Sequence, residues 1–230
     1  MSTATAINPA ATRTVDRALG LLASVCDAGE IGLSDCARSA GLATSTALRL
    51  LRTLESGGFV RRDDEGMFHA GPRIIQMGAT ALGRQELVKA ADPALRRMVA
   101  ASGESSYLSI LGANERALYV GMAEGTHPVR HISWVGRTIP IEGTAAGAAL
   151  LGEVPDCGYV VVSSIVEPDV SAVAASIVSP GGILGALSIV GPTYRIGEAQ
   201  AQALGQIVRN EARALAAQYS SALSTSTRWR

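Results

Sequence analysis

The first part of the chain has the apolar spacing of an amphipathic helix. Apolar side chains recur three or four positions apart, at Val15, Ala18, Leu19, Leu22, Val25 and Cys26. At 3.6 residues per turn these positions share one helix face. Gly29 follows the last of them and is expected to end the helix.

Two further helices are predicted after Gly29. Ser34 is a suitable N-cap for a short helix over residues 34–40, and Gly41 is its expected C-terminal stop. The next helix begins around Thr44 and ends at the pair of glycines that starts at Gly57. The short turn between these two helices is the spacing of a helix-turn-helix.

A β-hairpin is predicted next. Residues 59–62 and 67–70 are two short runs with strand character, and an acidic turn that ends in glycine, residues 63–66, separates them. Three helices followed by a hairpin favour a winged helix-turn-helix that binds DNA. The alternative is a small helical bundle with a hairpin, whose arginines are ordinary solvated side chains.

The third helix has two different faces. Its apolar stripe faces the core and consists of Ala47, Leu50, Leu51 and Leu54. The opposite face offers hydroxyls and arginines, at Ser45, Arg49, Arg52 and Ser56, with Thr46 beside them. The chain as a whole has no net charge, but residues 44–62 hold four arginines against one glutamate, a local net charge of +3. This face suits a DNA major groove, where arginine can bind guanine through two hydrogen bonds.

A connector and a second domain fill the rest of the chain. Helical spacing over residues 73–91 predicts a connector helix, and a second helix is expected to restart at Asp92 and Pro93, an N-cap and a first-turn proline. After residue 104 the spacing changes to that of strands, predicted at residues 106–112, 117–123, 129–134, 158–162, 170–178 and 183–192. A closing helix over residues 198–222 completes an α+β fold, a presumed antiparallel sheet flanked by helices.

A loop that runs into a helix of small residues is a candidate ligand site. Gly143 and Thr144 stand at the expected N-terminus of this helix, and alanines and a glycine follow. Small side chains let a ligand approach the backbone, and unpaired N–H groups favour an anion such as a carboxylate. Tight packing of the helix on a sheet requires the same small residues, so the pattern alone leaves both interpretations open.

Composition excludes several classes of protein. No apolar run approaches the length of a membrane span, and residues 1–12 lack the pattern of a secretory signal, so a cytoplasmic protein is expected. The three cysteines and three histidines fit neither a disulfide framework nor a metal site. We find no motif for catalysis or a bound cofactor, so an enzyme is not expected.

The N-terminal half resembles the IclR family of bacterial transcription regulators. The resemblance rests on TVDRAL at residues 14–19, GLATSTALRLLRTL at residues 41–54 and GFV at residues 58–60. It implies that the third helix contacts DNA, but the family's common basic residue and histidine are replaced here by Thr44 and Leu48. We expect the residues at the DNA to be Ser34, Thr44, Ser45, Thr46, Arg49, Arg52, Arg61 and Arg62.

The C-terminal half resembles the effector-binding domain of the same family, which has a GAF-like fold. The matching pieces include GES at residues 103–105, TAAG at residues 144–147 and ALSIVGP at residues 186–192. The resemblance implies an effector site at Gly143, Thr144, Ala145, Val162, Ala172, Ser188 and Val190.

This half departs from the family in two ways. Relatives carry some thirty helical residues where residues 152–157 stand alone, and this shortening is expected to remove one wall of the effector cavity or open it. Val162, Ala172 and Val190 also replace common polar residues. A more apolar or larger ligand than a small organic acid is therefore expected, or no ligand at all.

These expectations define a domain plan and a function. The plan is a disordered tail (1–12), a winged helix-turn-helix (13–72), a connector helix (73–91), an effector domain (92–222) and a second disordered tail (223–230). The function is that of a ligand-responsive regulator, presumed to be a repressor, which binds a pseudo-palindromic operator in double-stranded DNA as a homodimer or tetramer. The alternative is a constitutive DNA-binding or protein-interaction module whose shortened sensor binds no small molecule.

Overall fold

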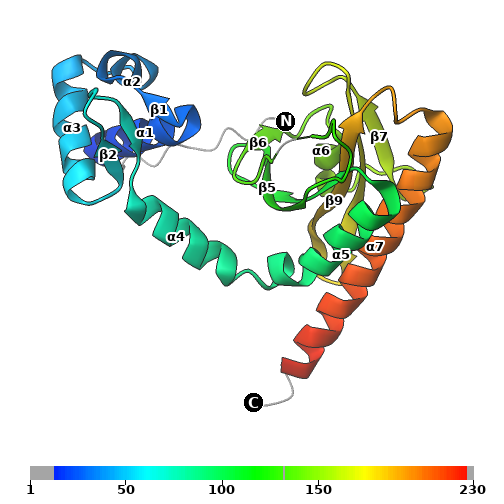
Figure 1. Cartoon of the computed structure of the whole chain (residues 1–230). Helices are drawn as coiled ribbons and strands as arrows, with labels where there is room; N and C mark the ends of the chain where they lie inside the picture. Colours follow the sequence, from blue (N-terminus) through cyan, green and yellow to red (C-terminus); the bar gives the residue numbers. More distant parts are fainter. Residues whose placement is uncertain (1–12, 132, 227–230) are drawn as a thin grey trace, which may run out of the picture. The chain divides into compact units, whose positions relative to one another are not determined.

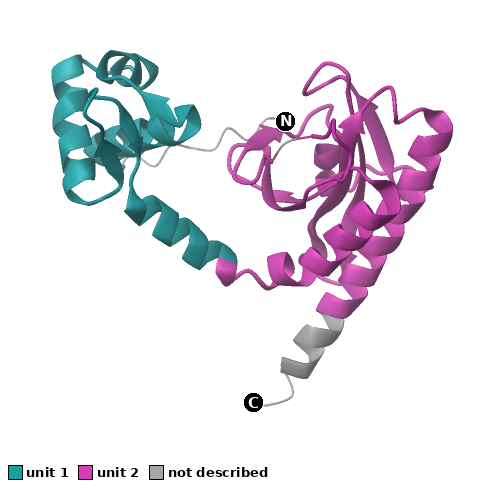
Figure 2. Ribbon diagram, in the orientation of Figure 1, with its two compact units in different colours: residues 1–82 teal, residues 83–230 magenta. Residues whose placement is uncertain are grey.

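The computed structural model describes residues 13–131 and 133–226. The chain divides into two compact units, with the boundary between residues 82 and 83 (Figures 1 and 2). The two tails of the domain plan lie outside the described residues, except that the last helix continues to Ser226 and so occupies part of the tail predicted from residue 223. No helix in the described part of the chain has both the length and the apolar character needed to cross a membrane.

The first unit is a three-helix fold with a small sheet. Its elements are α1 (Arg13–Ala28), β1 (Glu30–Ile31), α2 (Leu33–Ser39), α3 (Thr44–Ser56), β2 (Val60–Arg62), β3 (Phe68–Ala70) and most of α4 (Pro72–Gly83). The sheet is antiparallel in the order β1-β3-β2, so the predicted hairpin gains a third strand, too short to leave a sequence pattern. The core of this unit includes the fully buried Leu21, Leu51 and Phe68.

The turn between α2 and α3 depends on a glycine. Gly41 has φ of +63°, a left-handed conformation that side chains other than glycine rarely adopt. The backbone N–H of Gly41 donates to the carbonyl of Arg38, and that of Leu42 donates to the carbonyl of Ala37. These bonds close the end of α2 and direct the chain into α3. The prediction that Ser34 caps α2 is wrong, because the N-cap is Gly32 and Ser34 lies in the first turn.

The second unit is an antiparallel sheet between helices. Its elements are α5 (Glu86–Ser102), β4 (Ser105–Leu111), β5 (Arg116–Ala123), β6 (Thr138–Pro140), α6 (Ala145–Leu151), β7 (Val160–Ser163), β8 (Val170–Ser179), β9 (Gly182–Pro192) and α7 (Glu198–Ser226). The strand order is β6-β5-β4-β9-β8-β7. Helices α5 and α7 run side by side along one face of the sheet, and α6 packs on the other (Figure 1).

Alternation along the strands divides the core into two layers. Leu187 and Ile189 of β9 point to α5 and α7, whereas Ala186, Ser188 and Val190 point to α6. Because successive residues of a strand face opposite sides, this alternation fixes which residues can line a site on the α6 side.

The predicted connector differs from the observed one. The helical pattern over residues 73–91 is interrupted between α4 and α5, and α5 continues through Pro93 rather than restarting there. A proline inside a helix removes one backbone hydrogen bond, at a cost of about 3 kcal/mol. Leu87 and Ala91 before it and Leu95 after it are all buried, so packing on both sides of the proline outweighs this cost.

The strand predicted over residues 129–134 is also absent from the described positions of that segment. Residues 129–131 and 133–134 form a loop, and the next strand is β6. The loop is held by side-chain bonds instead of a strand ladder: the hydroxyl of Ser105 donates to the carbonyl of His131, and Arg130 binds Glu124. This arrangement lets His131 and Trp134 turn inward.

Candidate functional site

The exposed face of α3 presents hydroxyls and arginines as predicted. Ser45, Arg49 and Arg52 are exposed, while Leu50 and Leu51 are buried. The helix begins after Ala43, which provides no side-chain cap for the first turn. Its first N–H groups are therefore available to an external acceptor such as a phosphate.

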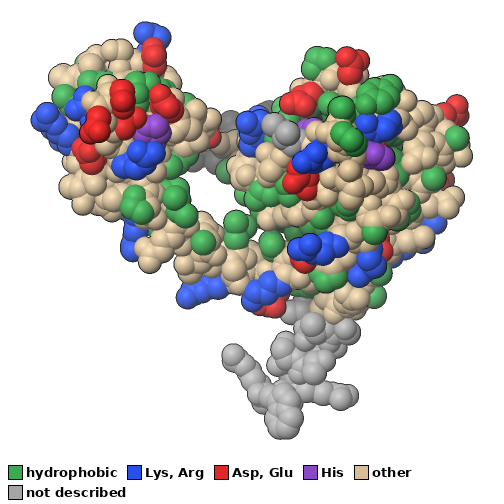
Figure 3. Space-filling view, viewed as in Figure 1, with side chains coloured by type: hydrophobic (Ala, Val, Ile, Leu, Met, Phe, Trp, Pro, Cys, Tyr) green, Lys and Arg blue, Asp and Glu red, His purple; other side chains and the backbone are tan. Residues whose placement is uncertain are grey.

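The hairpin formed by β2 and β3, which is the wing of the winged helix-turn-helix, contributes two exposed arginines. Arg61 and Arg62 lie on β2, and the Arg62 guanidinium donates to the carbonyl of Gly66 at 3.2 Å and stacks over Phe68. The turn is ordered by Asp63, which accepts the N–H of Met67 at 2.7 Å and contacts His69. Acidic and basic side chains stand side by side on the visible face of this unit (Figure 3).

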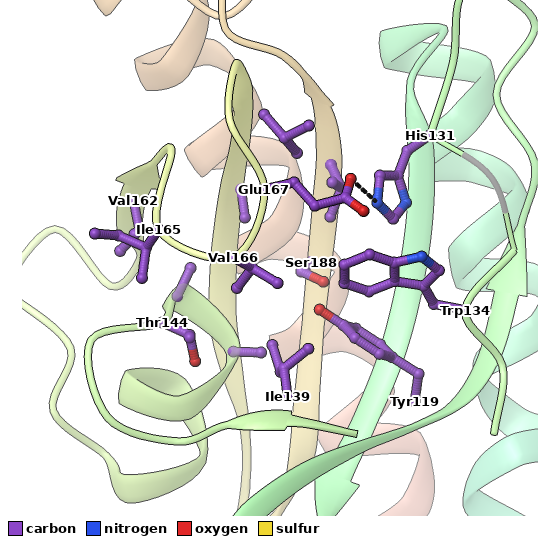
Figure 4. Close-up of a pocket in the computed structure, with 15 residues that line it drawn as sticks. Tyr119, His131, Trp134, Ile139, Thr144, Val162, Ile165, Val166, Glu167 and Ser188 are labelled. Carbon is purple, nitrogen blue, oxygen red and sulfur yellow. Dashed lines mark ion pairs between the residues drawn. The ribbon is translucent and has the colours of Figure 1, made fainter. Parts of the chain in front are cut away.

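The second unit encloses a pocket between the α6 face of the sheet and the loops above it (Figure 4). Val162 pairs with Ala172, and Ala172 pairs with Val190, so these three residues form one row across β7, β8 and β9. Ser188 lies two residues from Val190 on the same face, where it pairs with Ala174. Strand register thus brings four of the predicted effector residues together, although they are far apart in sequence.

Helix α6 forms a second wall of the pocket. Thr144 is its N-cap, and its hydroxyl accepts the N–H of Gly147 at 3.1 Å and donates to the carbonyl of Pro140 at 2.8 Å. Thr144, Ala145 and Ala146 all line the pocket. Gly143 does not, because it faces a separate open hollow that also includes Glu115 and Glu142.

An aromatic cluster that the sequence analysis missed forms the third wall. His131 contacts Trp134 edge-on with ring centroids 4.6 Å apart, and Trp134 contacts Tyr119 at 6.0 Å. The hydroxyl groups of Tyr119 and Ser188 point into the pocket (Figure 4). Burial raises the pKa of Tyr119 to about 12, so its hydroxyl stays protonated at neutral pH. The aromatic residues in this segment were the available signal, but a strand prediction for residues 129–134 did not place them in a site.

The loop between β7 and β8 closes the pocket. Its side chains Ile165, Val166 and Glu167 all line it, and Ile165 is 61% exposed on its outer side. The enclosed cavity has a volume of about 40 Å³, well below the roughly 300–1,000 Å³ of sites for drug-sized ligands. Residues of the short segment 152–157 line two other, open hollows and not this pocket.

Three polar atoms at the pocket have no hydrogen-bond partner among the described residues. They are Nε2 of His131, Nε1 of Trp134 and Oγ of Ser188, all buried. Nε2 of His131 faces Glu167, and Nε1 of Trp134 lies on the side of the indole away from the pocket, whereas the Ser188 hydroxyl points into it (Figure 4). Buried polar groups are normally hydrogen-bonded, so this hydroxyl marks a place where a ligand or water can bind. On the other side of its ring, Nδ1 of His131 contacts the Tyr107 hydroxyl at 2.7 Å.

Besides Tyr119, the pocket is lined by two ionisable side chains, His131 and Glu167. Nε2 of His131 lies 3.6 Å from a carboxylate oxygen of Glu167. Burial lowers the pKa of His131, Glu167 opposes this shift, and Arg137 adds to it. His131 is therefore uncharged at neutral pH. In the described part of the chain no three His, Cys, Asp or Glu residues gather in a way that could hold a metal ion.

Two sequence models of known domains match the chain. The IclR helix-turn-helix domain matches residues 14–64, and the C-terminal domain of the bacterial transcriptional regulator IclR matches residues 79–157. Together they cover more than half of the 230 residues.

Curated relatives agree with these matches. The HTH-type transcriptional repressor AllR of Escherichia coli is 26% identical over 222 residues, which span 80% of this chain and 82% of that protein. The transcriptional repressor IclR of Escherichia coli is 29% identical over 147 residues, 63% of this chain and 54% of that protein.

Solved structures share the fold. An IclR-type regulator from Alicyclobacillus acidocaldarius is 24% identical with a TM-score of 0.77, covering 91% of this chain and 99% of its own. An IclR homologue from Microbacterium hydrocarbonoxydans, complexed with 4-hydroxybenzoate, is 22% identical with a TM-score of 0.71, covering 89% and 98%. The chain therefore belongs to the IclR family, and it is a DNA-binding transcription regulator rather than an enzyme.

Proposed function

We propose that this regulator is a cytoplasmic repressor whose affinity for a pseudo-palindromic operator changes when a small molecule enters the pocket beside α6. The observation that carries the proposal is the largely apolar cavity into which the buried, unpartnered Ser188 hydroxyl points. Repression is supported by the two curated relatives, which are both repressors.

The exposed face of α3 is the proposed reading surface. Arg49 contacts a base edge, and Ser45 and Thr46 contact phosphates or bases at the start of the helix. Thr44 lies at the start of this helix and Arg52 lies one turn after Arg49, while Ser34, Arg61 and Arg62 contact the flanking backbone. Two copies place two such helices on half-sites about one helical turn apart, or a multiple of that.

A pairing surface for a homodimer or tetramer is available on the first unit. Val15 and Leu19 of α1 and Ile75 and Met77 of α4 are all at least half exposed. Exposed apolar side chains that recur along one element are typical of an interface. We propose that these residues pair the protomers.

Ligand entry requires part of the pocket to move. The homologue from Microbacterium hydrocarbonoxydans binds 4-hydroxybenzoate, a ring larger than the cavity of about 40 Å³ in this chain. A ligand of that size displaces the side chains of Ile165 and Val166 outward. Such a change alters DNA affinity only if the ligand binds the two arrangements of the protein with different affinity.

The test of DNA recognition is fluorescence anisotropy with the DNA upstream of the protein's own gene, with unrelated DNA as competitor. Arg49→Ala is expected to weaken specific binding by about 5- to 150-fold, the effect of one lost bidentate base contact. Arg96→Ala is the matched control, because Arg96 is an exposed arginine of α5 paired with Asp92. Equal affinity of the Arg49 variant and wild type would refute the assignment of the reading surface.

The test of ligand response is a screen of small molecules by thermal shift, followed by titration of the hits into the protein–DNA complex. A ligand that binds only the folded protein raises its stability. Release of the DNA by a hit supports the proposal. If no compound binds and the operator stays bound, the constitutive module is the correct function.

A further inference from the structure

The charge at the pocket is unusual for a site that would bind an acid. Within residues 13–131 and 133–226, Glu167 is the one carboxylate that lines the pocket, and no arginine or lysine lines it. Arg137 stacks on Trp134 with its guanidinium carbon 5.7 Å from the ring centroid, but it does not line the cavity.

His131 does not supply the missing positive charge. Its Nδ1 contacts the Tyr107 hydroxyl and its ring is buried, which lowers its pKa. Its Nε2 faces the carboxylate of Glu167 at 3.6 Å (Figure 4). A protonated His131 would pair with Glu167 first, so a second carboxylate in the cavity would still lack a partner.

The hydrogen-bonding groups of the pocket suit an uncharged molecule. The Ser188 hydroxyl points into the pocket and can donate or accept a hydrogen bond, and the protonated Tyr119 hydroxyl beside it can do the same (Figure 4). An uncharged carbonyl or hydroxyl oxygen can accept a hydrogen bond from either group. The remaining walls are apolar, with Val162, Ala172 and Val190 in one row.

The N-terminus of α6 does not supply enough positive charge to favour a ligand carboxylate in the pocket. A helix N-terminus carries a partial positive charge of about half an elementary charge, and α6 has only seven residues. The N–H of Gly147 is already taken by Thr144. A buried ligand carboxylate would lose its hydration and face the full negative charge of Glu167, and both effects disfavour the charged form.

We propose that the pocket selects an uncharged, ring-sized molecule with a carbonyl or hydroxyl group over the carboxylate of the same skeleton, and that Glu167 sets this preference. The proposal rests on the proposed function, because it takes the pocket to be the effector site. It identifies the effector class as neutral phenols, amides or esters.

The test compares matched probes by isothermal titration calorimetry on the full chain at pH 7.5. The probes are benzamide against benzoate, and 4-hydroxybenzamide against 4-hydroxybenzoate. Each amide is expected to bind wild type about tenfold or more tightly than its acid, the scale of one unfavourable charge contact at a partly buried site. In Glu167→Gln the acids are expected to gain about tenfold in affinity, while the amides change little.

Glu153→Gln is the matched control, because Glu153 is exposed, lines a different hollow and changes the net charge equally. Acids that bind wild type as tightly as the amides would overturn the inference and leave the proposed function intact. If no probe binds either wild type or Glu167→Gln at millimolar concentration, both the inference and the ligand-responsive function fail. The ratio of amide to acid affinity in wild type decides the question if the Glu167 variant does not fold.

Discussion

Thr144 links the stability of the second unit to the geometry of its pocket. The residue is 3% exposed and caps α6. Its hydroxyl oxygen accepts the N–H of Gly147, and its hydroxyl hydrogen is donated toward the carbonyls of Pro140 and Ile141. Thr144→Val keeps the shape of the side chain and removes the hydroxyl, so it isolates these hydrogen bonds.

The expected loss of stability in Thr144→Val follows from the two roles of the hydroxyl, as acceptor for the helix N-terminus and as donor to a carbonyl. Loss of an N-cap costs about 1 kcal/mol. Leaving a buried donor or acceptor without its partner adds about 1–3 kcal/mol. The expected loss in the free energy of unfolding is therefore about 2–4 kcal/mol. Thr144→Ser keeps the hydroxyl and removes one buried methyl, which costs about 0.8 kcal/mol.

The assay is urea denaturation of the full chain followed by the fluorescence of Trp134. The chain has one other tryptophan, Trp229, so the measurement uses a Trp229→Phe background. Trp134 borders the pocket and reports unfolding of the second unit. A Thr144→Val protein within about 0.5 kcal/mol of Thr144→Ser would refute the capping role.

Three more predictions concern pH, packing and assembly. Burial lowers the pKa of His131 from its ordinary 6.5, so the unfolded chain binds a proton at this residue more readily than the folded chain. The contribution of His131 to the free energy of unfolding is therefore complete above about pH 6.5 and falls as the pH drops toward the pKa of the folded state. His131→Gln should lose less stability than wild type between pH 6.5 and pH 5 by chemical denaturation, and equal slopes would contradict the assignment. In Gly147→Ala the new methyl would overlap the carbonyl of Ile141, so a loss of about 2 kcal/mol or more is expected in the same assay, and a neutral variant would show that α6 can shift freely. Ile75→Glu places a charge on a side chain that is 68% exposed, and sedimentation velocity should show a shift toward the monomer; an unchanged profile would place the interface elsewhere.

The fold of the first unit was predictable because its pattern is local. The buried face of α3 and the hairpin after it follow from spacing within a few residues, and the observed α3 begins at the predicted Thr44. Strand β1 was missed because two residues carry no periodicity. The cap of α2 was misplaced because the helix starts at Leu33 without a side-chain cap, so Ser34 gave a false signal.

The pocket was predictable where strand alternation and family resemblance act together. Ser188 and Val190 share a face because they are two residues apart, and register then places Ala172 beside Val190. The wall formed by Tyr119, His131 and Trp134 follows from loop conformation and side-chain bonding, for which a single sequence has no periodic signal. The prediction that a helix starts at Pro93 was wrong because tertiary packing on both sides of the proline outweighs its local preference for a helix start.

The shortened segment and the loop between β7 and β8 border different hollows of the second unit. Residues 152–157 border two open hollows on the surface, while the pocket itself is closed by Ile165, Val166 and Glu167. Two residues at the ends of this loop, Ser164 and Asp169, have φ near +57° and +58°, so the loop follows a sharply defined path. The loop also contributes Glu167, the one carboxylate among the described residues that line the pocket. If the pocket is the effector site as proposed, the loop that moves to admit a ligand is also the loop that carries Glu167, so a substitution at this one position should change both ligand entry and charge selectivity.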